Sequence, residues 1–183
     1  EIGSGLVGSE MCIRDSRTVV FLRNNESDYN RHSGYVVIFR ESLLAHAKEL
    51  GMTVIESEHY EADSFDAQHF VSTVFAHPDR PTAIINQANA SVLSQVLMAL
   101  HDAGMSIPQD VSVLSCGTYF EGEPTRFPIT EMPVMPEELC AEAMNLLVSA
   151  IEEHTDIKGS VELIEPALKR RGSVAEAGSG GTI

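Results

Sequence analysis

The sequence has 183 residues, of which 43% are hydrophobic, and this is enough for one ordinary domain with a buried core. Its 27 acidic residues outnumber its 12 basic residues and give a net charge of −15. Because nucleic-acid affinity comes largely from Lys and Arg side chains, this charge argues against direct contact with DNA or RNA. No apolar run approaches the ~20 residues of a membrane span, and no CxxC pair or histidine spacing indicates a metal site.

The first residues contain glycines at the spacing G-x-G-x-x-G, at positions 3, 5 and 8, which is the fingerprint of dinucleotide binding. That motif needs a buried strand before it, and only two residues precede Gly3. In addition, residues 6–16, LVGSEMCIRDS, back-translate to a string that resembles a transposase-type sequencing adapter. We therefore expect residues 1–16 to be adapter-derived and non-native. We expect no nucleotide cofactor, and a natural sequence that begins at about Arg17.

From there, apolar runs alternate with segments whose apolar residues recur at helical spacing. The predicted strands are residues 18–22, 52–55, 82–85 and 111–114. The predicted helices are residues 31–50, a segment capped by Asp63 or Ser64 with Phe65, Phe70 and Val74 inward, and residues 91–103. Residues 24–28 are predicted to be a polar loop. This alternation predicts the α/β class, with a parallel sheet and helices on both faces.

After the fourth strand the alternation stops. Residues 128–132 are predicted to be extended, and residues 136–153 form a helix that Pro136 and the acidic side chains after it begin. The apolar stripe of this helix is Leu139, Ala143, Leu146, Leu147 and Ala150. Residues 160–164 predict a last strand, and residues 175–183 predict a disordered tail.

In a parallel sheet, ligands bind beyond the carboxyl ends of the strands. In this sequence those ends lead into residues 24–30, 57–63, 86–90 and 116–120. These four loops are therefore the segments expected to carry function.

The stretch PTAIINQANASVLSQVLMALHDAGMSIPQDVSVLSCG, residues 81–117, resembles the LacI/GalR-type transcription regulators. The family pattern is a PTA strand, an Asn-Asp turn, a helix, a glycine and then I/V-P-x-D-V-S-V. Further pieces of the family pattern follow in the right order, and the resemblance covers residues 17–174. These pieces are Arg31-x-x-Gly34, His77-Pro78-Asp79-Arg80, Pro128-Ile129-Thr130, Glu137-Glu138-Leu139 and Arg171-Gly172-Ser173.

The resemblance implies a periplasmic-binding-protein-like fold of two lobes, in which a small polar effector closes a cleft. Residues 17–174 would be a truncated effector-binding domain that holds mainly the second lobe. The helix at residues 136–153 would belong to the otherwise missing first lobe, so we expect its apolar stripe to lack a partner. The helix at residues 91–103, apolar around more than one face, would be buried in the lobe or share in a dimer surface.

The resemblance also implies a cytoplasmic homodimer that reaches operator DNA only through a separate N-terminal helix-turn-helix headpiece, absent from this chain. We expect the ligand-sensing domain of such a regulator, with no membrane contact and no metal. The alternative is a periplasmic-type solute-binding protein of a transporter, which has the same fold. The I-P-Q-D-V-S-V stretch and the closing R-R-G-S favour the regulator. An enzyme is not expected, because no nucleophile–base pair or phosphate loop remains.

Four residues are candidate ligand contacts. Arg31 occupies the position where the family often places an effector-contacting arginine, although a solvated surface arginine fits equally well. Asn86 and Asn89 supply amides in the third loop, and either one could instead cap the following helix. Thr118 follows Gly117 where the family commonly carries an aspartate pair. That departure argues against a plain monosaccharide ligand, and the Thr118 hydroxyl is then a ligand contact or part of an ordinary loop.

Overall fold

The computed structural model describes residues 17–61, 64–76, 80–118, 127–134, 136–154, 158 and 164–175, with the side chains of residues 117 and 118 left out. The predictions for residues 1–16, for the Asp63 cap, and for most of the strand at 160–164 and the tail at 175–183 fall outside these ranges.

The described strands form one five-stranded sheet in the order β2-β1-β3-β4-β5, and every neighbouring pair is parallel. The strands are β1 (Thr18–Leu22), β2 (Thr53–Glu56), β3 (Ala83–Asn86), β4 (Ser112–Thr118) and β5 (Thr130–Pro133). All carboxyl ends therefore lie at one edge of the sheet. The predicted parallel α/β fold is confirmed.

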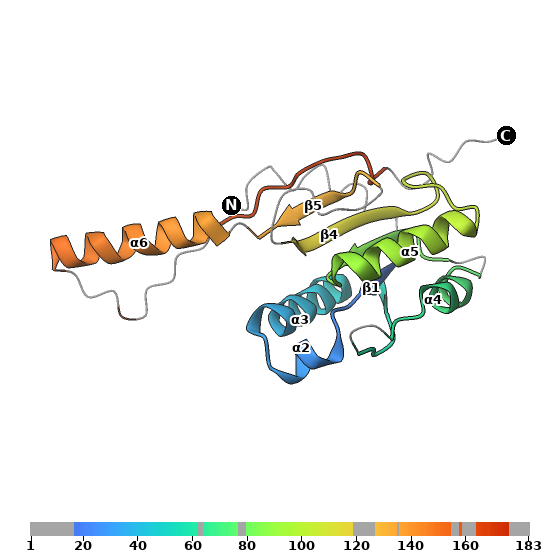
Figure 1. Cartoon of the computed structure of the whole chain (residues 1–183), viewed down its shortest axis with the longest axis horizontal. Helices are drawn as coiled ribbons and strands as arrows, with labels where there is room; N and C mark the ends of the chain where they lie inside the picture. Colours follow the sequence, from blue (N-terminus) through green and yellow to red (C-terminus); the bar gives the residue numbers. More distant parts are fainter. Residues whose placement is uncertain are drawn as a thin grey trace.

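Helices pack on both faces of this sheet (Figure 1). On one face, α4 (Ala67–Val74) and α5 (Ala90–Asp102) form the larger core, in which Leu93 and Leu97 of α5 pack with Ile84 of β3. On the other face, α3 (Gly34–Glu49) places Phe39 and Leu43 against Phe21 of β1. Helix α5 packs against both the sheet and its neighbour α4, which explains why it is apolar around more than one face.

The first predicted loop and the starts of two helices differ from the sequence prediction. Residues 26–30 form a short helix, α2 (Glu26–Asn30), because the Asn25 side chain accepts a hydrogen bond from the backbone N–H of Asp28 at 3.0 Å. Arg31 ends α2, and α3 begins three residues later at Gly34. In the same way, Asp66 rather than Ser64 caps α4. Short polar side chains that accept from backbone N–H groups therefore set the starts of α2 and α4, whereas Ser33, before α3, makes no such bond.

The segment 164–175 contributes no named strand, yet it holds the far edge of the sheet. Lys169 forms an isolated antiparallel bridge with Glu131 of β5. The Ser173 hydroxyl donates to the Val113 carbonyl at 2.6 Å and accepts from the backbone N–H of Thr130 at 2.7 Å. Ser173 therefore ties β4 and β5 together.

Helix α6 (Pro136–Glu153) extends away from the sheet (Figure 1) and has no buried residue. Leu139 and Leu147 of its apolar stripe are 43% and 46% exposed, so neither side chain is buried against the described part of the chain. In the part of the chain that the structure describes, no helix is both long and apolar enough to cross a lipid bilayer.

Candidate ligand-binding site

Three of the four predicted loops meet at the carboxyl edge of the sheet. The backbone N–H of Gln87, just after β3, donates to the Leu22 carbonyl of β1 at 2.9 Å. The backbone N–H of Glu26, at the start of α2, donates to the Tyr60 carbonyl after β2, also at 2.9 Å. The loops after β1, β2 and β3 are therefore one connected surface.

Arg23, the first residue after β1, is the centre of this surface and is only 6% exposed. Its Nη1 lies 2.8 Å from Nε2 of His59, and its Nη2 lies 3.5 Å from a carboxylate oxygen of Glu26. The guanidinium stacks over the Tyr29 ring, 4.3 Å from the ring centroid. Its Nε has no hydrogen-bond partner among the described residues. Arg23 is thus a buried cation whose guanidinium is only partly hydrogen-bonded by the described residues.

One phenol and one amide complete the cluster, and the phenol of Tyr60 adjoins it. The Tyr29 hydroxyl donates to the side-chain oxygen of Gln87 at 3.3 Å, and the Tyr60 hydroxyl donates to the Arg23 carbonyl at 3.0 Å. Burial raises the pKa of both tyrosines above the ordinary value, so both stay neutral and act as donors. We call Arg23, Glu26, Tyr29, His59 and Gln87 the Arg23 cluster.

Asn86, a predicted ligand contact, is almost completely buried, with 1% exposed. Its amide nitrogen donates to the Ser115 hydroxyl at 2.9 Å and to the Ala88 carbonyl at 3.2 Å. Its amide oxygen accepts from the backbone N–H of Ala88 at 3.1 Å. The polar atoms of Asn86 therefore already serve the turn after β3 and the contact to β4.

The other three predicted residues lie at the same edge but outside the Arg23 cluster. Asn89 is exposed and caps α5, since its side chain accepts from the backbone N–H of Val92 at 3.0 Å. Arg31 is exposed at the end of α2. Thr118 is the last residue of β4, and its side chain lies outside the described part of the structure. A ligand role for these residues stays a prediction.

None of the five members of the cluster was predicted from the sequence as a ligand contact. The one available signal was the position of Arg23, a charged residue placed directly after an apolar strand. His59 approaches Arg23 from 36 residues away, so only the folded sheet brings the two side chains together.

The described residues line three cavities that bear on the site. One, of about 290 Å³, adjoins the Arg23 cluster between the loop after β2 and α4, and its lining includes His59, Asp66 and His69. A second, of about 250 Å³, lies between α3, β5 and the start of α6. No group of three His, Cys, Asp or Glu side chains in the described ranges could hold a metal ion.

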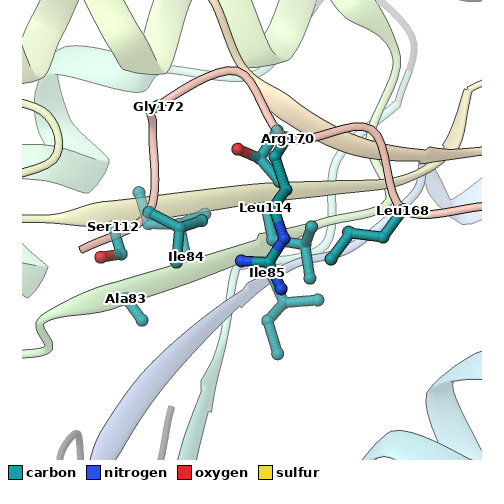
Figure 2. Close-up of a pocket in the computed structure, with 10 residues that line it drawn as sticks. Ala83, Ile84, Ile85, Ser112, Leu114, Leu168, Arg170 and Gly172 are labelled. Atoms are coloured by element: carbon teal, nitrogen blue, oxygen red, sulfur yellow. The ribbon is translucent and has the colours of Figure 1, made fainter. Parts of the chain in front are cut away.

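The third cavity, of about 230 Å³, lies over β3 and β4 beside residues 168–174 (Figure 2). The exposed Arg170 side chain extends there toward Ile85 and Leu114. The lining of this third cavity is mainly apolar and reaches Ser112, the first residue of β4. This cavity is therefore an uncovered part of the sheet, and it does not belong to the carboxyl edge.

The parallel sheet and the polar cluster at its carboxyl edge define one lobe of an α/β binding protein. A family model described as "periplasmic binding protein-like domain" matches residues 14–174. The chain therefore belongs to the periplasmic binding protein-like domain family, over nearly the range in which the sequence resemblance was found. Among curated proteins, no sequence matches the chain.

Solved structures confirm the fold. A LacI family transcriptional regulator from Bifidobacterium animalis subsp. lactis superposes with a TM-score of 0.71 at 22% identity, over 95% of this chain and 61% of that one. A LacI family regulator from Arthrobacter sp. FB24, in complex with lactose, gives 0.66 at 16% identity, over 93% and 62%. A LacI-family regulatory protein from Corynebacterium glutamicum gives 0.62 at 19% identity, over 94% and 63%. This chain spans about three fifths of the length of these proteins.

Proposed function

We propose that this chain is the ligand-sensing domain of a LacI-type transcription regulator, with a binding role and no catalytic one. The observation that carries the proposal is the Arg23 cluster, in which three loops place a buried guanidinium, a phenol and an amide at the carboxyl edge of the sheet. Membership of the periplasmic binding protein-like family and the similarity to structures of LacI family regulators support it.

The proposed ligand is a small polar metabolite, such as a carbohydrate. A guanidinium offers a fixed fork of donors, and the Tyr29 hydroxyl and Gln87 amide both donate and accept. These groups match the hydroxyls and carboxylates of sugars and sugar acids. The solved regulator from Arthrobacter holds lactose, which supports a carbohydrate class.

The proposed mechanism is a shift between two arrangements of two lobes. A ligand that binds the closed arrangement better than the open one increases the population of the closed state. In a cytoplasmic homodimer, that change alters how a pair of N-terminal headpieces sits on operator DNA. The DNA contact belongs to the headpiece, outside this chain.

We also propose that α6 packs on the first lobe of the longer protein. Its apolar stripe is exposed against the described part of this chain. The solved regulators are longer than this chain, and the additional length gives room for such a lobe.

Ligand binding by the full chain tests the ligand proposal. Mono- and disaccharides and sugar acids are screened by thermal shift, and positives are measured by calorimetry. At least one of them is expected to raise the unfolding temperature, because a ligand that binds only the folded state stabilises it. Arg23→Gln is expected to weaken that binding, while Lys48→Gln, on the exposed end of α3, leaves it unchanged. Equal binding by Arg23→Gln and the original chain, or no carbohydrate response at all, contradicts the proposal.

The intact gene separates the regulator from the transporter-associated alternative. A helix-turn-helix encoded upstream supports the regulator, and a secretion signal encoded there contradicts it.

A further inference from the structure

The contacts of His59 determine which of its ring nitrogens carries the proton. Nε2 faces Nη1 of Arg23 at 2.8 Å, and Nδ1 faces a carboxylate oxygen of Glu26 at 2.5 Å. A guanidinium only donates hydrogen bonds, and an ionised carboxylate only accepts them. Nε2 must therefore accept and Nδ1 must donate. Only the neutral imidazole with its proton on Nδ1 satisfies both contacts.

We propose that His59 is a proton-sensitive contact that holds Arg23 in the binding site while neutral and releases it when protonated. In the imidazolium, Nε2 carries a hydrogen that points at an N–H of Arg23. Two donors and two positive charges then face each other, and the contact cannot persist. Glu26 stays paired with the imidazolium through Nδ1. Protonation therefore breaks the contact of His59 with Arg23 and leaves its contact with Glu26 intact.

The exposure of the two partners suits this role. The His59 side chain is 69% exposed and exchanges protons with solvent, whereas the Arg23 side chain is 7% exposed. Arg23 has few other acceptors, because its Nε lacks a partner and Glu26 lies at 3.5 Å. Loss of the His59 acceptor therefore leaves a buried cation still less well paired.

The other titratable groups around His59 come from the loop after β1, from α2, from β2 and the loop after it, and from α4 and its cap. Arg23 follows β1, and Glu26 and Tyr29 belong to α2. The remaining groups share the adjoining cavity and are Glu56, Glu58, Tyr60, Asp66 and His69. Among these described groups, only Arg23 and Glu26 lie at hydrogen-bond distance from the imidazole, so these two determine which ring nitrogen donates and which accepts.

If the proposed function holds, on which this consequence rests, ligand affinity falls on acidification. Release of Arg23 removes the cation from above the Tyr29 ring and from the loop that Tyr29 connects to Gln87. The contact therefore makes the binding edge responsive to the protonation of His59.

The tautomer of His59 in the full chain is the direct test, measured by long-range proton–nitrogen NMR with assignment from His59→Gln. At about pH 8, where a histidine is largely neutral, we expect Nδ1 to carry the proton. A predominant Nε2–H form, or equal amounts of both forms, overturns the proposal. His46, whose Nδ1 contacts a backbone carbonyl on α3, is an internal reference in the same spectrum.

The response of Arg23 is the second measurement. Between about pH 8 and pH 5.5, above the usual range of carboxyl groups, its Nε signal is expected to move together with the His59 ring signals. His59→Gln, whose amide oxygen can still accept from Arg23 but does not titrate, is expected to abolish that movement. An Arg23 signal that is constant with pH, or that still moves in His59→Gln, overturns the proposal. Because neither measurement uses a ligand, its failure is distinguishable from failure of the ligand screen.

Discussion

At the scale of single residues, the carboxyl edge contains two kinds of buried polar group. Asn86 is buried and its polar atoms are all used by the lobe itself, whereas Arg23 is buried and keeps an unpartnered Nε. A buried polar side chain with its partners in place stabilises a turn. The Nε of Arg23, which has no partner among the described residues, distinguishes it from Asn86 and supports the proposed ligand role of Arg23.

Asn86→Ala is expected to destabilise the chain by about 1–3 kcal/mol, because it leaves buried partners on Ala88 and Ser115 unsatisfied. Urea unfolding followed by circular dichroism measures this loss. Ser115→Ala is the control with a smaller expected loss, since Asn86 then keeps its two contacts with Ala88. Unchanged stability of Asn86→Ala contradicts the structural role and favours the ligand role predicted from the sequence.

Asp110 makes stability depend on pH. Its carboxylate accepts from the backbone N–H of Ser106 at 2.8 Å and from Arg80 at 2.9 Å, and the Ser106 bond foremost holds its pKa below the ordinary value. A lowered pKa adds stability above the unfolded-state pKa, and this stability is lost as the pH falls through the folded-state pKa.

Asp110→Asn is therefore expected to be less stable than the original chain near neutral pH, by less than about 1 kcal/mol for this half-exposed group. The difference should shrink as the pH falls below about 4, where carboxyl groups gain a proton. Urea titrations at several pH values measure both quantities. A difference that is the same at every pH refutes the assignment.

The sequence predicted where the binding loops lie, but it did not predict which side chains contact one another there. Strand ends locate the binding loops, because parallel strands place all their carboxyl ends at one edge. Burial of Arg23, however, depends on Tyr29 from a helix that was predicted as a loop, and on His59 from a different loop. These contacts are tertiary, and no spacing in the sequence encodes them.

At the scale of elements, α5 and α6 are both helices with apolar residues at helical spacing, but they differ in how deeply those residues are buried. Leu97 of α5 is fully buried in the core that α5 forms with the sheet and α4, whereas Leu147 of α6 is 46% exposed. Periodicity alone gives the same interpretation for both helices. The sequence separates them in two ways: residues 91–103 are apolar around more than one face, which predicts burial, and the resemblance assigns residues 136–153 to another lobe.

The same substitution at the two leucines tests this contrast. Leu97→Ala is expected to lose about 2–5 kcal/mol, because it leaves a cavity in the core. Leu147→Ala is expected to change the free energy of unfolding by less than about 0.5 kcal/mol, as for other surface positions. Urea unfolding of both variants provides the comparison. Equal losses would show that α6 packs within this chain and would contradict its assignment to a separate lobe.

At the scale of the whole molecule, charge is distributed in the way that a sensing domain without a DNA-binding surface requires. The chain carries a net charge of −15, and α6 alone contributes five glutamates and no basic residue. The described basic residues of the binding edge are individually placed, with Arg23 buried and Arg31 exposed, and they do not form a contiguous basic patch. Electrostatics therefore favour small ligands over a polyanion.

The chain alone is therefore expected not to bind DNA. Duplex DNA repels a polypeptide of this charge, because binding requires cations that release condensed counterions. Fluorescence anisotropy with a labelled duplex measures binding, at low salt where any electrostatic attraction is strongest. Added polylysine is the positive control, and the anisotropy is expected to stay flat with this chain up to the highest concentration tested. A saturable rise that weakens with salt would place a DNA-binding surface within residues 17–174 and would overturn the separation of sensing from DNA contact.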